Sequence, residues 1–169
     1  MRQANQIIYR MANEKPECMG MGTTMTFLYF MDKHALLAHV GDSRCYRIRD
    51  GRIMQLTKDH SLVAELVRIG EITPEQARNH PYRNIITRAL GTDDYVAVDA
   101  QDIPVEENDV YLLCSDGLSN YLEEDELLHA VQNQPSDALC DHLVQIALDR
   151  GGRDNITVVA AYCGGEVAR

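Results

Sequence analysis

The sequence predicts an α+β protein built from antiparallel sheets flanked by helices. Apolar strand-like runs follow one another through tight turns, and strands joined in this way pair antiparallel. Helical segments are grouped together instead of alternating with single strands, which favours α+β over α/β. The 169 residues, 45% of them hydrophobic, are enough for one domain with its own core.

The chain begins with a predicted helix that is followed by two predicted strands. An apolar face repeats at the helical spacing i, i+3, i+4, i+7, i+8 through Ala4, Ile7, Ile8, Met11 and Ala12. A loop over residues 14–22 leads to strands that we expect at residues 23–31 and 36–40, the second ending at Gly41.

A β-hairpin is expected at Asp50-Gly51, between strands at residues 44–49 and 52–56. An Asp-Gly pair between two strand patterns indicates a type I′ turn, because both central residues of that turn need a positive φ. The hairpin would fix antiparallel pairing of its two strands.

Two short helices are predicted in the more polar segment that follows. The first covers residues 62–69 and stops at Gly70. The second begins at Thr73, the expected N-cap, with Pro74 at the first helical position and Gln76 completing a capping box. Residues 84–90 fit neither pattern.

The C-terminal half is expected to combine further strands with two longer helices. Strands are predicted at residues 96–100, 109–114 and 155–163. Helices are predicted at residues 123–132 and from a cap at Ser136 to Gly151-Gly152.

The net charge limits the classes of partner. The 26 acidic and 16 basic residues give a formal charge of -10. This argues against a nucleic-acid groove or an anionic membrane surface, since both select basic patches. It leaves open solubility, metal-binding acidity and attraction for basic partners. No apolar stretch approaches the about 20 residues that span a bilayer.

The cysteines predict reduced thiols used as small core residues. Their number is odd and no two have CxxC spacing; they are Cys18, Cys45, Cys114, Cys140 and Cys163. The N-terminal sequence is polar and does not resemble a signal peptide. Both observations predict a cytoplasmic protein.

Two acidic signatures near the C-terminus indicate the chemistry. They are Leu113-Cys114-Ser115-Asp116-Gly117-Leu118 and Gly151-Gly152-Arg153-Asp154-Asn155-Ile156-Thr157. In each, an aspartate lies where an apolar strand-like run meets a glycine. If the two runs are neighbours in one sheet, Asp116 and Asp154 converge at one end of it. Paired carboxylates with few nitrogen or sulfur ligands suit a hard cation such as magnesium or manganese.

Six motifs in one order then identify a family. They are Gly20-Met21-Gly22-Thr23-Thr24, Gly41-Asp42-Ser43-Arg44, Leu56-Thr57-Lys58-Asp59-His60-Ser61, Ile86-Thr87-Arg88-Ala89-Leu90-Gly91, Leu113-Cys114-Ser115-Asp116-Gly117 and Gly152-Arg153-Asp154-Asn155. This series resembles the metal-dependent protein phosphatase 2C (PPM) family in its bacterial serine/threonine phosphatase form, over nearly the whole chain.

The resemblance implies a single, partial catalytic domain over residues 1–169 with an α-β-β-α sandwich fold. It implies hydrolysis of phosphoserine and phosphothreonine at a centre of two or three manganese or magnesium ions. A metal-bridging water is then the nucleophile, so no side chain is a covalent catalyst. The substrates would be phosphorylated targets of a Ser/Thr protein kinase.

The resemblance also assigns residues. Asp116 and Asp154 match metal-binding aspartates, and Asp59 matches a position that helps to bind a third, weaker metal. Residues of about 61–84 match a flap that borders the substrate cleft. The residues expected to support these ligands are Ser115, Gly117, Asn155 and His60.

Each assigned residue also has a structural alternative. Asp116 and Asp154 could be turn formers, and Asp59 could cap the helix that begins near Ser61. For His60, a supporting or helix-start role competes with acid–base catalysis. Gly41-Asp42-Ser43-Arg44 is interpreted as a structural turn.

One departure from the family pattern matters. The Asp-Gly-x-Gly-Gly motif, whose aspartate bridges both metals, and an upstream phosphate-binding arginine have no match here. We therefore expect weak metal binding and a fold that lacks N-terminal strands. Three hypotheses remain open: a truncated chain, a second chain or homodimer that covers the gap, or a catalytically impaired pseudophosphatase that acts as a binding module.

A cysteine-dependent phosphatase is a rival interpretation. Cys163 and Arg169 have the Cys-x5-Arg spacing of that class. The mechanism needs the loop to lead into a helix N-terminus, and the sequence continues into none.

Overall fold

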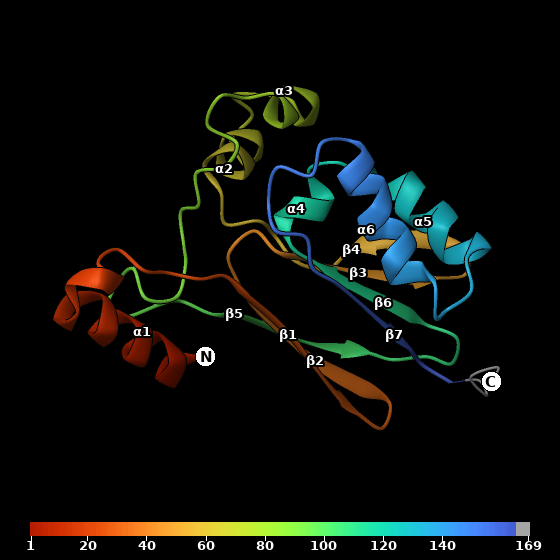
Figure 1. The fold of residues 1–169 in the computed structure, drawn as a ribbon. Helices are drawn as coiled ribbons and strands as arrows, with labels where there is room; N and C mark the ends of the chain where they lie inside the picture. The colour runs from red at the N-terminus through yellow and green to blue at the C-terminus, as the bar shows by residue number, and fades with distance from the viewer. Residues whose placement is uncertain (165–169) are drawn as a thin grey trace. The chain divides into compact units, whose positions relative to one another are not determined.

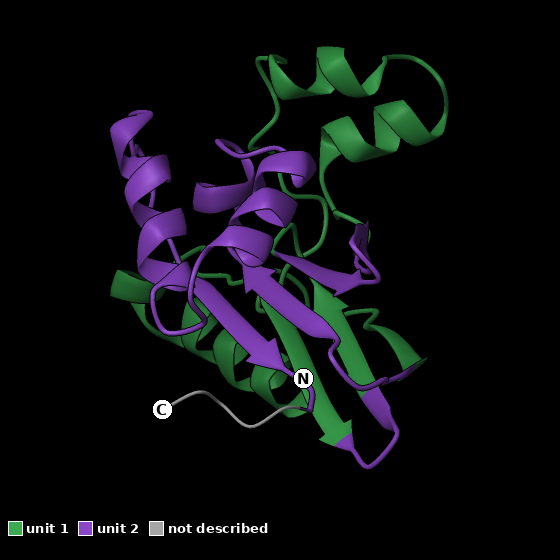
Figure 2. Ribbon diagram, turned by 90° about the vertical axis from the view of Figure 1, so that its right-hand side faces the viewer, with its two compact units in different colours: residues 1–30, 36–43, 58–103 green, residues 31–35, 44–57, 104–169 purple. Residues whose placement is uncertain are grey.

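The computed structural model describes residues 1–164, and these form two compact units (Figure 2). Unit 1 comprises residues 1–30, 36–43 and 58–103. Unit 2 comprises residues 31–35, 44–57 and 104 onward. Because the chain passes between the units several times, each contains segments that are distant in sequence.

Unit 1 contains most of a three-stranded sheet and the N-terminal helices. The sheet has the order β1-β2-β5, formed by β1 (Met25–Met31), β2 (His34–Val40) and β5 (Asp99–Pro104) (Figure 1). The preceding helices are α1 (Arg2–Glu14) and the 3-10 helix η1 (Pro16–Cys18). The first two strands begin and end within two residues of their predicted bounds.

The apolar face predicted for α1 is confirmed only in part in unit 1, because Ile7 is 50% exposed. Ala4 and Ile8 pack against a cluster of Val40, Leu90 and Val96. Asn5 lies on the same face, is 1% exposed and accepts a hydrogen bond from the Gly91 amide at 2.8 Å. Its amide nitrogen donates to the backbone carbonyls of residues 93 and 94. A buried asparagine thus joins the helix to the loop that follows Leu90.

The strand predicted at residues 96–100 is wrong, because β5 begins only at Asp99. Val96 and Val98 pack in the apolar cluster of unit 1 without joining a ladder. The true strand is mostly polar and exposed, with Ile103 as its one buried residue. The apolar residues therefore indicated the segment that packs in the core, and not the polar strand that follows it.

The predicted flap segment contains two short helices of unit 1. Helix α2 spans Leu62–Arg68, and helix α3 spans Pro74–Arg78. The capping box of α3 is confirmed, since the Thr73 hydroxyl accepts from the Gln76 amide and the Gln76 side chain accepts from the Thr73 amide. Helix α2 is capped by Ser61, whose hydroxyl accepts from the Ala64 amide.

Unit 2 is organised around a four-stranded antiparallel sheet of order β4-β3-β6-β7. Its strands are β3 (Arg44–Arg49), β4 (Arg52–Gln55), β6 (Val110–Cys114) and β7 (Val158–Tyr162). The hairpin between β3 and β4 is confirmed, and Asp50 and Gly51 have φ values of 49° and 68°. Both values are positive, as a type I′ turn requires.

Three helices cover one face of this sheet (Figure 1): α4 (Asp116–Ser119), α5 (Glu124–Asn133) and α6 (Leu139–Asp149). The core between them joins apolar side chains of both layers: Tyr46, Ile48, Leu112, Cys114, Leu118, Leu122, Leu127, Ala130, Leu139, Leu143 and Ala147. Strands in antiparallel sheets with grouped helices confirm the predicted α+β class.

Some local predictions in unit 2 are wrong. Ser136 does not cap α6, which begins after a turn in which the amides of Ala138 and Leu139 both bond to the Pro135 carbonyl. The last strand is shorter than the predicted 155–163. The one-turn helix α4 was not predicted, because four residues give no periodicity.

All five cysteines within the described part of the chain are free, as predicted, and Cys45 and Cys114 are buried. Across residues 1–164, no helix has the length and apolar character needed to cross a membrane.

Candidate metal site

The two acidic signatures lie at the same end of neighbouring strands. Strands β6 and β7 pair antiparallel, with Cys114 opposite Val158. The ladder continues one step further, since the Ser115 amide donates to the Thr157 carbonyl at 3.1 Å. Asp116 follows the end of β6 and Asp154 precedes the start of β7, so the predicted neighbourhood of the two runs is confirmed.

Ser115 and Gly117 hold the two loops together. The Ser115 hydroxyl accepts from the Thr157 amide at 3.0 Å and donates to the Asn155 carbonyl at 3.1 Å. Gly117 is buried, and a Cβ atom on it would lie only 2.3 Å from the Asn155 carbonyl oxygen. Only glycine therefore allows the first turn of α4 to approach the Asp154 loop this closely.

The two carboxylates repel each other. Burial raises the pKa of the half-buried Asp116, and the negative charge of Asp154 raises it further. The Gly117 amide and the Arg44 guanidinium oppose this shift without cancelling it. A cation between the carboxylates would remove the repulsion, which is the electrostatic condition of a metal site.

Residues that the sequence did not point to hold the Asp154 loop. Arg150 donates to the Tyr121 carbonyl at 2.6 Å and forms a two-pronged ion pair with Glu126. The Tyr121 hydroxyl accepts from the Arg153 amide at 3.2 Å. Within the loop, the Asn155 amide donates to the Asp154 carboxylate at 2.7 Å. These partners are far apart in sequence, so no local signal could have revealed them.

The donor set fits a hard cation in kind but not in number. Oxygen-only carboxylate donors suit magnesium or manganese. Among residues 1–164, however, no group of three or more His, Cys, Asp or Glu side chains could hold a metal ion. Asp116 and Asp154 would supply two ligands of the about six that such a cation takes. Tight binding therefore needs ligands beyond these two.

Asp59 and His60 belong to unit 1. Asp59 is half-buried, and it is not the cap of α2, because Ser61 fills that position. His60 is 7% exposed and its ring lies 4.9 Å from that of His39. Burial lowers the pKa of His39, as does the neighbouring His60. The metal role of Asp59 stays a prediction.

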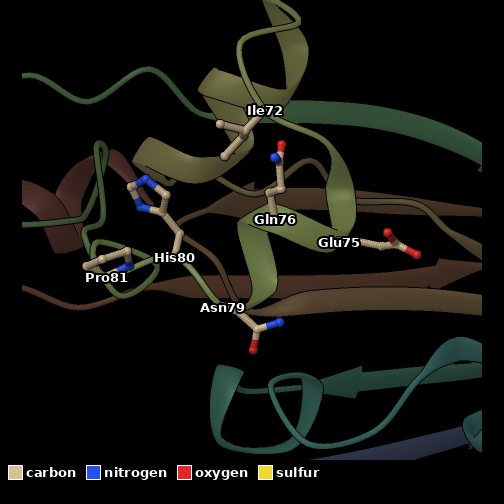
Figure 3. Close-up of a pocket in the computed structure, with 6 residues that line it drawn as sticks. All are labelled: Ile72, Glu75, Gln76, Asn79, His80 and Pro81. Atoms are coloured by element: carbon tan, nitrogen blue, oxygen red, sulfur yellow. The ribbon is translucent and has the colours of Figure 1, made fainter.

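The segment predicted to be a flap contains an open pocket of about 480 Å³. It is lined by one stretch of unit 1: Ile72, Glu75, Gln76, Asn79, His80 and Pro81. Glu75 and Asn79 point away from the other lining side chains (Figure 3).

The rival cysteine motif gains no support. Burial raises the pKa of Cys163, and the charge of Asp109 raises it further, whereas a nucleophilic cysteine needs a lowered pKa. The other end of the motif, Arg169, lies outside the described residues.

Comparison with known families and proteins identifies the family to which the chain belongs. The family model "Protein phosphatase 2C" matches residues 1–156. The chain is also 41% identical to the serine/threonine phosphatase stp of Listeria welshimeri over 160 residues, which is 94% of this chain and 64% of that protein. The chain therefore belongs to the protein phosphatase 2C family, and it spans about two thirds of the length of this relative.

Solved structures of bacterial phosphatases agree with this family assignment. The serine/threonine phosphatase Stp1 of Staphylococcus aureus superposes with a TM-score of 0.92 at 40% identity, covering 97% of this chain and 65% of that one. The catalytic domain of the phosphatase PstP, solved in complex with two manganese ions, gives a TM-score of 0.87 at 39% identity, covering 96% of this chain and 68% of that one.

Proposed function

We propose that this chain acts in the metal-dependent hydrolysis of phosphoserine and phosphothreonine in proteins. The observation that carries the proposal is the pair Asp116 and Asp154, two carboxylates at one end of the β6–β7 pair in a protein phosphatase 2C fold. Their mutual repulsion favours a bound cation, because no described basic side chain of unit 2 fully neutralises the two charges.

Asp116 and Asp154 would hold the cation, and manganese or magnesium suits their oxygen donors. When bound, the metal lowers the pKa of water and neutralises charge on a phosphoryl group. The rest of the local structure positions the two ligands. Ser115 fixes the separation of the loops, Gly117 permits their close approach, and Asn155 orients Asp154 through its backbone amide.

Three further roles follow from the proposal. Asp59 would help to bind a third, weaker metal, and His60 would support it. Residues 61–84 would act as a flap beside the substrate, so that residues 1–169 work as one catalytic domain. The substrates would be targets of a Ser/Thr protein kinase in the cytoplasm.

A second copy of the chain is the partner that we propose for strand β1. This strand is at the edge of its sheet and carries no charged residue. Phe27 and Tyr29 are 40% and 56% exposed. An uncharged, apolar edge strand is prone to pair with another strand. A monomer at micromolar concentration by light scattering would rule out this homodimer.

The alternative of a pseudophosphatase that only binds partners is not supported, because the matched relatives are named as phosphatases. The assay is hydrolysis of p-nitrophenyl phosphate and of a phosphothreonine peptide with added manganese, compared with Asp154→Asn. We expect manganese-dependent turnover that the substitution abolishes. Absence of turnover by the unmodified chain at high protein concentration would contradict the proposal.

A further inference from the structure

The two ends of the flap segment, residues 61–84, are joined at their base in unit 1. The Leu62 amide donates to the Ile85 carbonyl at 2.9 Å, and the Thr87 amide donates to the His60 carbonyl at 2.8 Å. Ser61 and Ile86 face each other as an isolated antiparallel bridge between these bonds. So short a ladder is only marginally stable by itself. The flap therefore needs other contacts to keep one orientation.

Asp99 provides such contacts to both ends of the flap. Its Oδ2 atom lies 3.2 Å from Nε2 of His60, the residue just before the segment. Its Oδ1 atom accepts a hydrogen bond at 2.6 Å from Nη1 of Arg88, shortly after the segment. One carboxylate at the start of β5 thus joins the two chain ends.

His60 is oriented for this contact by the backbone. Its Nδ1 atom accepts from the Gly41 amide at 3.0 Å, so the neutral ring has its proton on Nε2, facing Asp99. Arg88 Nη1 also lies 2.9 Å from Nε2. Since both atoms are then donors, Arg88 bonds instead to Asp99 and to the Ala97 carbonyl.

The electrostatics favour an ionised Asp99. Burial raises the pKa of Asp99, but hydrogen bonds from His60 and Arg88 outweigh burial and leave the pKa lowered. The side chains of Arg88 and Asp99 are 36% and 48% exposed, so the ion pair alone contributes little stability. Together with the bonds of His60 to Gly41 and Asp99, the ion pair joins three separate segments, namely the end of β2, the flap base and β5.

We propose that Asp99, held by His60 and Arg88, is a clamp that fixes the orientation of the flap and thereby positions protein substrates. The proposal rests on the phosphatase function proposed above. Asp99 is a positioning residue, since it acts through the flap and its pocket. When the clamp is released, the flap samples more orientations, and a substrate that contacts it binds less tightly.

Hydrogen exchange followed by mass spectrometry tests the clamp without any need for activity. In Asp99→Asn, which keeps the side-chain shape, amides of residues 61–84 should exchange up to about fivefold faster, the upper limit for a partly exposed ion pair. Helices α5 and α6 should exchange as before. The matched control is Asp94→Asn, which removes an exposed carboxylate of the same unit. Unchanged flap exchange in Asp99→Asn would overturn the clamp.

A double-variant cycle tests whether the residues act together. Arg88→Gln should raise flap exchange as Asp99→Asn does, and the double variant should exceed neither single variant by more than about twofold. Arg88→Lys should restore most of the protection, because it retains the charge. Additive effects of the two single variants would show independent roles and contradict the proposal.

Kinetics separate positioning from general damage. For a phosphothreonine peptide, Asp99→Asn should raise KM about three- to tenfold, while kcat for p-nitrophenyl phosphate should stay within about twofold. An equal loss for both substrates would overturn the positioning role. If the unmodified chain hydrolyses neither, the proposed function fails, and hydrogen exchange still decides on the clamp.

Discussion

The two ends of strand β6 carry aspartates in opposite electrostatic conditions. Asp109, just before the strand, is 1% exposed and accepts from both Nε and Nη2 of Arg49 at 2.6 Å. The Tyr111 hydroxyl and the Glu106 amide bond to it as well. Asp116, just after the strand, faces Asp154 instead. One carboxylate is thus fully paired, while the other lies beside a like charge.

The pKa shifts follow this difference. Burial raises the pKa of Asp109, but the hydrogen bonds led by Arg49 outweigh burial and leave it lowered. The pKa of Asp116 is raised by burial and by Asp154. A carboxylate whose hydrogen bonds are all made, such as Asp109, stabilises the fold. Two like-charged carboxylates side by side, such as Asp116 and Asp154, cost stability and are available for a cation. Asp109 at one end of β6 is therefore a structural residue, whereas Asp116 at the other end is a candidate cation ligand.

Removal of the fully hydrogen-bonded Asp109 carboxylate should have the largest effect on stability. Asp109→Ala leaves the Arg49 guanidinium without its main partner, and we expect a loss of about 3 kcal/mol, at the lower limit for a buried pair because Arg49 is 19% exposed. Urea denaturation at pH 7 measures it.

The same variant has a pH signature. Because the pKa of Asp109 is lowered in the folded state, its contribution is complete above the unfolded pKa of about 3.9 and is lost as pH falls through the folded pKa. The difference between Asp109→Ala and the unmodified chain should therefore shrink in acid. A loss below about 1 kcal/mol at pH 7 would contradict the assignment.

Separation of the two signature loops should have the next largest effect. In Gly117→Ala, the new Cβ would overlap the Asn155 carbonyl, and we expect a loss of about 2 kcal/mol together with weaker manganese binding. Calorimetric melting and manganese titration measure both. As a control, Gly70→Ala in unit 1 adds a Cβ where nothing lies within 4 Å; the φ of 79° makes alanine strained there, so it should lower stability but leave manganese binding unchanged.

Loss of the Ser115 hydroxyl should be milder. Ser115→Ala removes its bonds to Thr157 and Asn155, and we expect a loss of about 1 kcal/mol in urea denaturation. Ser115→Thr keeps the hydroxyl and should recover most of it. If alanine and threonine behaved alike, the hydroxyl would not hold the loops.

The smallest effect is a gain. Without metal, Asp116→Asn removes the repulsion from Asp154, so the variant should be slightly more stable than the unmodified chain at pH 7. Because the folded pKa of Asp116 is raised, the penalty exists above that pKa and is absent below about pH 3.9, where the carboxyl is neutral in both states. The advantage should therefore vanish in acid. If Asp116→Asn were less stable than the unmodified chain at pH 7, the proposed repulsion between Asp116 and Asp154 would be contradicted.

Local signals predicted much of the fold. Asp50-Gly51 specified its hairpin and Thr73 its capping box, because turn and cap chemistry depend on adjacent residues. The strand expected at residues 96–100 failed because Val96 is buried by tertiary packing, whereas β5 is polar. Ser136 failed as a cap because the turn after Pro135 decides where α6 begins.

The two carboxylates of the candidate site could be predicted from the sequence, but the residues that hold their loops could not. Asp116 and Asp154 follow from the strand patterns and the resemblance to the family. Arg150 and Tyr121 act through contacts between segments far apart in sequence, so no motif reveals them.

Manganese titration by isothermal calorimetry tests the central claim, that Asp116 and Asp154 form a cation site. The full chain should bind manganese, and Asp116→Asn and Asp154→Asn should each weaken binding at least about tenfold. Asp137→Asn, which removes an exposed carboxylate of the same unit, should bind as the unmodified chain does. Equal manganese affinity in all four proteins would contradict the account.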